Sequence, residues 1–230
     1  MNDDFKHIKQ NEFLINWLTL IFILVVAMIV IGGITRITDS GLSMVEWRPF
    51  LGFLPPLGDQ EWQRVFNLYK NTPEYSYYNK GMLLSEFKFI FFWEYFHRLW
   101  GRIIGIVFII PFTYLVIRKK LDKFITFRLL IILFFGSLQA FIGWWMVKSG
   151  LIDKPDVSQY RLAIHFGNSL LILFLLFWLI LDLKHKKSEI KCDLNLIIFF
   201  IIFITILAGS LVAGMDAGLM YNTYPLMNDS

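Results

Sequence analysis

Charged side chains and cysteine are both scarce in this sequence. Asp, Glu, Lys and Arg make up only 17% of the 230 residues, whereas 57% are hydrophobic and 18% are aromatic. Soluble domains average about 25% charged and about 45–50% apolar residues, so the composition argues against a soluble domain. Because Cys192 is the only cysteine, an internal disulfide and a metal site built from several cysteines are both excluded.

Long apolar runs, in contrast, are abundant and indicate the fold class. A helix needs about 20 apolar residues to cross the hydrocarbon core of a bilayer. Runs of this kind without Asp, Glu, Lys or Arg are Phe13–Thr35, Leu129–Val147, Leu162–Leu181 and Leu194–Met215. A further run, Phe89–Ile117, is equally long but contains a cluster of ionisable residues. We therefore predict an all-α integral membrane protein with five membrane-spanning helices.

The distribution of basic residues predicts the orientation in the membrane. The short segments 118–128 and 182–193 contain five and four Lys or Arg residues, respectively. The longer segment 36–88 carries six basic and six acidic residues. Lys and Arg concentrate in cytoplasmic loops, so we expect a cytoplasmic N-terminus and segment 36–88 outside. The net charge of +4 thus reflects membrane topology, and we expect no nucleic-acid partner.

Within segment 36–88, the stretch DQEWQRVFNLYKN (59–71) has the pattern of a short helix. Asp59 is a suitable N-cap residue, and Pro73 follows the end of the pattern. Four apolar side chains recur at i, i+3, i+4 and i+7 and form one stripe: Trp62, Val65, Phe66 and Tyr69. We expect this helix to lie on the outer membrane surface or to cap the helix bundle.

The sequence contains an internal echo. The first expected helix closes with GGITRITDSGL (32–42), and the fifth closes with GSLVAGMDAGL (209–219), 177 residues later. Such self-similarity indicates a structural repeat. We predict that residues 1–193 form an N-terminal four-helix membrane bundle with the outer loop 36–88, and that residues 194–230 begin a second, repeated bundle. Since most of this second copy is lacking, we interpret the chain as truncated.

One apolar run carries a dense cluster of ionisable residues. The stretch FFWEYFHRLWGRIIG (91–105) contains Glu94, His97, Arg98 and Arg102, and the acid and the two arginines share one helix face. Charge at membrane depth is costly, so such residues usually face a cavity or a partner. A Glu–Arg ladder that reaches toward the interface is the alternative, but it does not explain His97. The preceding Ser85 is a suitable N-cap for this helix.

A second membrane histidine accompanies this cluster. The stretch RLAIHFGNSLL (161–171) places His165 between Arg161 and Asn168, in the same leaflet as His97. Two imidazoles on facing helices can hold an iron porphyrin, and arginines can pair with its propionates. A zinc site would need three or four protein ligands, whereas two histidines and one glutamate are present. A proton relay through the acid and the histidines is a further interpretation.

Five segments of the chain resemble the haem A synthases in their alphaproteobacterial and mitochondrial form. That family's first helix end and first outer loop resemble GGITRITDSGLSMVEWRPFLGFLPPL, and its second-helix signature resembles LSEFKFIFFWEYFHRLWGR. Its third and fourth helices resemble GSLQAFIGWWMVKSGL and YRLAIHFGNSLL, and its second half begins like LVAGMDAGLMYNTYPLM. The resemblance covers most of the chain, in the family's order.

The resemblance implies an eight-helix protein with two similar four-helix bundles, one for a haem b cofactor and one for the substrate. It implies oxidation of the C8 methyl group of haem O to a formyl group, which gives haem A for cytochrome oxidase. Glu94 and His97 match the acid–histidine motif of the N-terminal bundle, the substrate side, and His165 matches its second histidine. We expect these three residues to be catalytic, with His97 and His165 as candidate iron ligands. The candidate propionate contacts are Arg98, Arg102, Arg161 and Arg36.

The sequence departs from this family in one large respect. The second histidine pair, which would hold haem b, is expected 177 residues after His97 and His165, and hence beyond Ser230. Such a chain is expected to bind haem O and to lack the haem b that would accept the electrons removed from it. The paired outer-loop cysteines of some bacterial members are also absent, as is expected of this subgroup.

The resemblance also implies a location and partners. We expect a multi-pass protein of a bacterial inner membrane that meets haem O synthase, an electron acceptor and the lipid bilayer, with a homo-oligomer as a further option. Two other functions stay open: a haem-binding electron carrier similar to b-type cytochromes, and a proton-coupled transporter. The transporter is disfavoured because the echoed segments share one orientation.

Overall fold

The computed structural model describes residues 2–46, 52–151, 155–185 and 194–220, and every regular element within these ranges is a helix. The helices are α1 (Asn2–Ile37), α2 (Asp59–Tyr69), α3 (Pro73–Tyr77), α4 (Leu84–Ile117), α5 (Lys123–Gly150), α6 (Gln159–His185), α7 (Leu194–Gly214) and α8 (Ala217–Met220).

Five of these helices are long and apolar enough to cross a membrane. The spans are Asn11–Ile37 within α1, the whole of α4, α5 and α6, and Leu196–Gly214 within α7. Outward-facing apolar side chains such as Ile23 and Phe89, each 57% exposed, suit contact with lipid. The predicted all-α membrane fold with five spans is confirmed.

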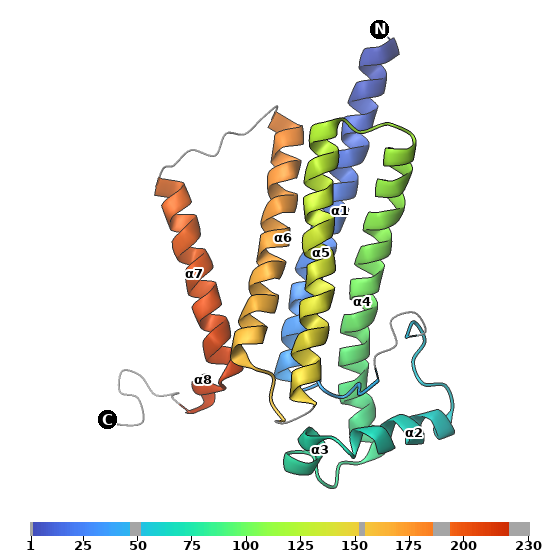
Figure 1. Ribbon diagram of the computed structural model, residues 1–230, viewed down its shortest axis with the longest axis vertical. Coiled ribbons are helices and arrows are strands. Elements are labelled where there is room, and N and C mark those ends of the chain that lie inside the picture. The colour runs from blue at the N-terminus through green and yellow to red at the C-terminus, as the bar shows by residue number, and fades with distance from the viewer. Residues whose placement is uncertain (1, 47–51, 152–154, 186–193, 221–230) are drawn as a thin grey trace.

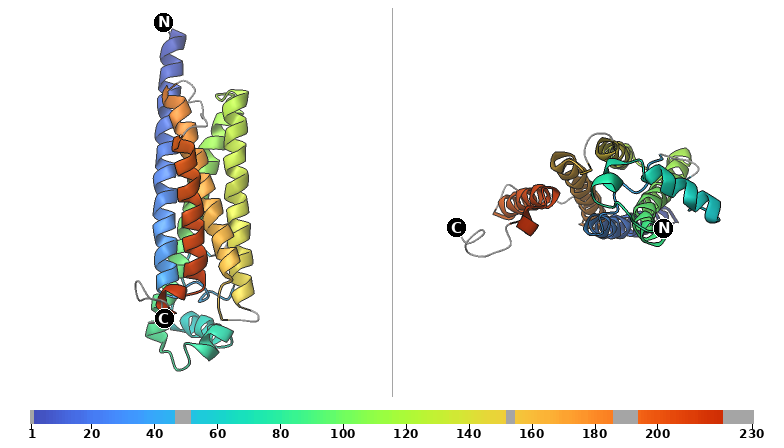
Figure 2. Two further views of the ribbon diagram at one scale, coloured as in Figure 1. Left: turned by 90° about the vertical axis from the view of Figure 1, so that its left-hand side faces the viewer. Right: turned by 90° about the horizontal axis from the view of Figure 1, so that it is seen from below.

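The membrane helices α1, α4, α5 and α6 form a bundle, and α7 lies beside it (Figures 1 and 2). Helix α1 packs against both α4 and α6, and α5 packs closely against α6 but only lightly against α4. Consequently α4 and α6 occupy opposite corners of the bundle, and side chains on their inner faces point toward a shared interior. Helix α7 packs mainly against α6, and its last turn also meets the end of α1, where Arg36 donates to the carbonyl of Ala213 (3.0 Å).

The two ends of the bundle differ. Helices α2 and α3 lie at the end where α1 and α7 finish and α4 begins, which we call the α2 end (Figure 1). The start of α1, the α4–α5 connection and the last turn of α6 lie at the opposite end. The main apolar core fills the half of the bundle away from the α2 end and consists of Leu14, Trp17, Leu18, Ile21, Val25, Phe108, Phe112, Leu115, Leu129, Ile132, Ile172, Leu176, Leu179 and Ile180.

Two tryptophans fasten α1 to α4. The indole N–H of Trp17 donates to the carbonyl of Val107 (2.8 Å), and that of Trp100 donates to the carbonyl of Leu24 (3.0 Å). Lipid gives no hydrophobic drive for helix association, and an unpaired N–H in an apolar medium is costly. These interhelical bonds therefore help to set how α1 and α4 lie against each other.

The predicted surface helix is present as α2, and it caps the bundle. Phe66 and Tyr69 are buried against Phe87, Ile90 and Phe91 of α4, with Trp62 and Val65 at the edge of this second core. The predicted N-cap is wrong, because Gly58, at φ 79°, takes that position and Asp59 is already helical. An acid in the first turn still interacts favourably with the helix dipole.

Helix α4 also begins slightly earlier than predicted. Its N-cap is Leu83 and not Ser85. The side chain of Glu86 accepts a hydrogen bond from the backbone N–H of Leu83 (2.7 Å), which satisfies one of the free donors at the helix start. Because a carboxylate three residues ahead supplies this bond, the helix needs no serine cap.

Candidate functional site

The two histidines predicted to act together lie on the diagonal helices of the bundle. His97 belongs to α4 and His165 to α6. The two imidazoles are close enough to interact electrostatically, although 68 positions separate them in the chain. The fold thus places the two histidines that the sequence pattern singled out on diagonal helices of one bundle.

Each imidazole occupies space that a glycine on a neighbouring helix leaves open. A Cβ atom at Gly32 of α1 would lie 3.3 Å from Nε2 of His97, and one at Gly143 of α5 would lie 3.0 Å from Cε1 of His165. Real Cβ contacts are rarely this short, so any larger residue would displace the rings. The two glycines are therefore part of the site, and sequence reasoning did not single them out for this role.

A side-chain amide network holds His165 from the side of α5. Nε2 of Gln139 lies 3.2 Å from Nε2 of His165 and donates to the carbonyl of His165 (3.0 Å). Asn168 in turn donates to Oε1 of Gln139 (2.7 Å) and to the carbonyl of Phe135 (3.0 Å). Nδ1 of His165 is buried and has no hydrogen-bond partner in the described part of the chain. Gln139 was missed from sequence, where it occurs only as one residue of the stretch GSLQAFIGWWMVKSGL in a predicted span.

Glu94, the one acid of the ionisable cluster in residues 91–105, is deeply buried, at 2% exposed. Its Oε2 accepts from the hydroxyl of Ser43 and from the backbone N–H of Met44, both at 2.7 Å. Its Oε1 accepts from Arg98, which also donates to the carbonyl of Met44 (3.3 Å). The i, i+4 pair of the alternative interpretation therefore exists, but it is buried and holds the segment after α1 against α4.

Arg98 and Arg102 line a cavity of about 260 Å³ between α4 and the segment that precedes α2. Nη1 of Arg102 donates to the carbonyl of Gly52 (2.9 Å), and its guanidinium lies 5.4 Å from the ring centre of Phe53. Ligand pockets commonly enclose about 300–1,000 Å³. This cavity therefore suits a charged side arm of a ligand better than a whole macrocycle.

Arg161 lies one turn before His165 on α6. Its Nη1 donates to the carbonyl of Trp145 on α5 (3.1 Å), and its guanidinium stacks 4.3 Å from the ring centre of Trp145. Cation–π contact and hydrogen bond together hold this arginine near the α2 end of the α5–α6 pair.

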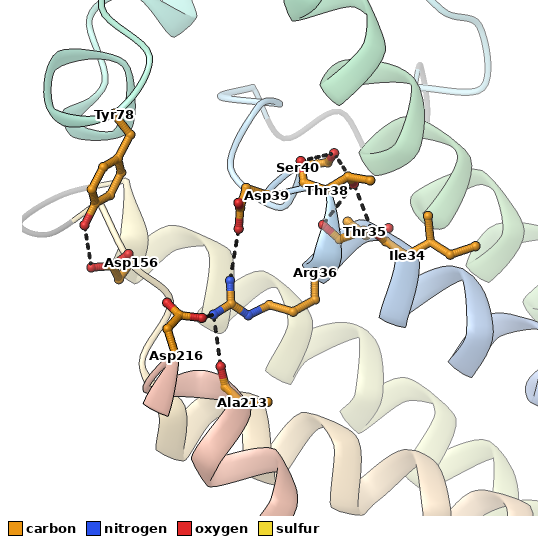
Figure 3. A network of polar contacts seen from close by, with 10 residues as sticks. All are labelled: Ile34, Thr35, Arg36, Thr38, Asp39, Ser40, Tyr78, Asp156, Ala213 and Asp216. Atoms are coloured by element: carbon orange, nitrogen blue, oxygen red, sulfur yellow. Dashed lines mark hydrogen bonds and ion pairs between the residues drawn. The ribbon is translucent and has the colours of Figure 1, made fainter. Parts of the chain in front are cut away.

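Arg36 connects the two copies of the echoed sequence (Figure 3). It pairs with Asp39 in its own copy (3.2 Å) and with Asp216 in the other (2.5 Å). It also donates to the carbonyl of Ala213 (3.0 Å), its own counterpart 177 residues away. Asp39 and Asp216 both have a positive φ, 47° and 50°, so the echoed segments also share a left-handed backbone position at the same point of the repeat.

Comparison with known proteins identifies the family. Residues 15–230 match the COX15-CtaA family, described as cytochrome oxidase assembly protein. A Heme A synthase of Nitrosospira multiformis is 47% identical over 92% of this chain, and one of Nitrosomonas eutropha is 46% identical over 97%. A Heme A synthase of Parvibaculum lavamentivorans is 45% identical over 92% of the chain. No solved structure matches the chain.

The aligned region covers only part of each relative. The chain spans 62% of the Nitrosospira and Parvibaculum proteins and 65% of the Nitrosomonas protein. The match nevertheless extends over nearly the whole chain, and it includes the α4 and α6 segments that carry the histidine pair. This chain is therefore a multi-pass membrane protein of the COX15-CtaA family.

Proposed function

We propose that this chain carries the haem O site of a haem A synthase, which oxidises the C8 methyl group of haem O to a formyl group. The observation that carries the proposal is the placement of His97 and His165 on the diagonal helices α4 and α6, each imidazole seated beside a glycine of a neighbouring helix. The relatives named Heme A synthase add support.

His97 and His165 are assigned to hold the porphyrin, either at its iron or at its two faces. Nδ1 of His165 supports this assignment, because it is buried and has no partner in the described residues. A buried polar atom without a partner is costly, and a bound ligand would remove that cost. Gln139 and Asn168 orient the ring, as outer-shell partners of metal ligands commonly do.

Arg98 and Arg102 are the preferred propionate partners because both line the cavity at the α2 end. Arg161, next to His165, is the third candidate. Arg36 ranks last, since two carboxylates and a carbonyl already engage its guanidinium.

Glu94 is assigned as the first proton acceptor of the reaction. Written with water as the oxygen source, conversion of the methyl to a formyl group releases four protons and four electrons. Each group bonded to Glu94 is a hydrogen-bond donor, which suits an ionised carboxylate. A bound haem b would supply the one-electron redox chemistry that these electrons require.

The proposed orientation places the α2 end outside a bacterial inner membrane. The start of α1 and the connection with Lys119 and Lys120 lie together at the opposite end (Figure 1). Basic residues favour the cytoplasmic side. The methyl oxidation would then occur near the outer surface.

The first test is a chromatogram of haems extracted from membranes that contain this chain and a haem O source. A haem A peak would support the proposed reaction. Haem O retained without conversion, with a stable redox spectrum, would favour the electron-carrier function for these residues. Absence of any bound haem would contradict the proposed site.

A second prediction concerns Gly143. Gly143→Ala places a methyl group 3.0 Å from the ring of His165, and overpacking typically costs about 1–3 kcal/mol. We therefore expect affinity for haem to fall about tenfold, measured by absorbance titration of the purified protein.

Gly136→Ala on the same helix is the matched control. No atom lies within 4 Å of a Cβ built at Gly136, and both variants gain the same helix propensity. Equal haem affinity of the two variants would contradict the idea that Gly143 makes room for His165.

A further inference from the structure

Backbone carbonyls fix the orientation of the two side-chain amides beside His165. A carbonyl oxygen can only accept a hydrogen bond, and only the nitrogen of an Asn or Gln amide can donate one. Nδ2 of Asn168 lies 3.0 Å from the carbonyl oxygen of Phe135, and Nε2 of Gln139 lies 3.0 Å from the carbonyl oxygen of His165. Each amide is therefore held in one orientation, in which Oε1 of Gln139 accepts a hydrogen bond from Asn168 (2.7 Å).

The amide of Gln139 in turn determines which ring nitrogen of His165 carries a proton. Nε2 of Gln139 has two hydrogens, of which one is donated to the carbonyl of His165, and it also lies 3.2 Å from Nε2 of the ring. Because an amide nitrogen only donates, Nε2 of the ring must be the acceptor and carries no proton. A neutral imidazole has one N–H group, so in His165 that group is Nδ1–H.

This tautomer leaves a buried donor without an acceptor. Nδ1 of His165 is buried and has no hydrogen-bond partner among the residues that the structure describes. It lies on a side of the ring where Gly143 of α5 carries no side chain, since a Cβ atom there would be 3.6 Å from Nδ1. An unsatisfied buried donor is costly, so the arrangement suits a ligand that brings an acceptor atom.

The same arrangement argues against His165 as an iron ligand. A histidine that binds a metal offers the lone pair of one ring nitrogen and commonly donates from the other nitrogen to a carboxylate, a carbonyl or water. In His165, Gln139 already engages the lone pair of Nε2. Ligation through Nδ1 would require a proton on Nε2, and this proton would face an N–H group of Gln139.

We propose that His165 donates a hydrogen bond from Nδ1–H to an oxygen atom of the bound porphyrin and does not ligate its iron. Gln139 and Asn168 are the positioning residues that select this tautomer. The proposal rests on the proposed function, because it concerns the same ligand, and it decides between the two roles left open for this histidine. Haem O offers its propionates and the hydroxyl group of its long side chain as oxygen acceptors.

The first test is ¹⁵N NMR of the histidine-labelled chain in micelles, without haem. The signals of His165 are those that disappear in His165→Ala. We expect a protonated Nδ1 and an unprotonated Nε2, and we expect the Nε2 signal to shift in Gln139→Met, which lacks the donor. A proton on Nε2 in the wild-type chain would overturn the proposal.

Ser137→Ala is the matched control on the same helix. The hydroxyl of Ser137 donates to the carbonyl of Leu133 within α5 (2.9 Å) and takes no part in the amide network. We expect the His165 signals of this variant to equal those of the wild type. An equal shift in Ser137→Ala and Gln139→Met would overturn the selection of the tautomer by Gln139, since it would show a general response of α5 to the loss of a polar side chain.

The second test measures haem affinity and iron coordination together. The wild-type chain and His165→Ala are titrated with ferric haem b and with haem O, and absorbance spectra are recorded. We expect affinity to fall about tenfold in His165→Ala for at least one haem, with no change in the spin state of the iron, because the variant loses a hydrogen bond and not an axial ligand. A low-spin bis-histidine spectrum that is lost in His165→Ala would overturn the proposal, as would unchanged affinity for both haems.

The two haems also identify the acceptor, because haem b has propionates but lacks the hydroxyl-bearing side chain of haem O. A loss of affinity for both haems assigns the hydrogen bond to a propionate, and a loss for haem O alone assigns it to the hydroxyl group. A chain that binds neither haem would contradict the proposed function. A proton on Nε2, which is measured without haem, would contradict the present proposal alone.

Discussion

Glu94→Ala is expected to abolish haem A formation in a protein that also carries the second bundle, and to destabilise the α2 end of the bundle in this chain. Removal of the carboxylate leaves the Arg98 side chain, 12% exposed, without its ion-pair partner. It also removes the acceptor for Ser43 and for the N–H of Met44. Loss of one member of a buried ion pair typically costs about 3–5 kcal/mol. Denaturant unfolding in micelles and haem extraction would measure the two effects.

Glu94→Gln separates the structural effect from the chemical one. The amide oxygen can still accept hydrogen bonds, but the side chain cannot take up a proton from the substrate. We expect a smaller loss of stability than in Glu94→Ala and the same loss of haem A. A variant that produces haem A at the wild-type level would remove Glu94 from the proposed mechanism.

The second large effect is expected at the opposite end of the bundle. Arg128 of α5 and Asp182 of α6 form an ion pair whose side chains are 11% and 15% exposed. The guanidinium also lies 4.7 Å from the ring centre of Trp178. Arg128→Ala leaves a buried carboxylate, so we expect a loss of about 3–5 kcal/mol in the free energy of unfolding.

A double variant provides the control for this pair. Replacement of a whole buried ion pair by apolar residues of similar volume is often neutral or stabilising. We therefore expect Arg128→Met combined with Asp182→Leu to recover most of the stability lost in Arg128→Ala. A double variant as unstable as the single one would show that the ion pair is not the cause.

Local sequence signals were sufficient to predict the helices, but they predicted the helix ends less well. Each span is visible as a long apolar run, because the bilayer requires a minimum length of apolar helix. The caps were harder to place, since the choice of Leu83 over Ser85 depends on a bond from the side chain of Glu86. The stripe of α2 predicted a buried face, but the packing partner Phe87 comes from another helix.

In the candidate site, too, some residues could be predicted from local sequence and others only from helix packing. The histidines, Glu94 and the arginines could be chosen from the sequence because ionisable residues are expensive within a membrane span. Gly143 and Gln139 carried no such signal. Their significance depends on the position of His165, 22 and 26 residues away along the chain, and hence on how α5 packs against α6.

The internal echo shows what the sequence reveals and what the tertiary structure adds. Its sequence alone revealed two related segments, but their contact through Arg36 and Asp216 is a property of the folded chain. The number of spans, the fold class and the choice of chemically active residue types follow from local composition, because water and lipid act on each segment separately. The placement of His97 and His165 on diagonal helices, and the hydrogen bonds of Glu94 with Ser43 and Met44, depend on helix packing, because these residues are far apart in the chain.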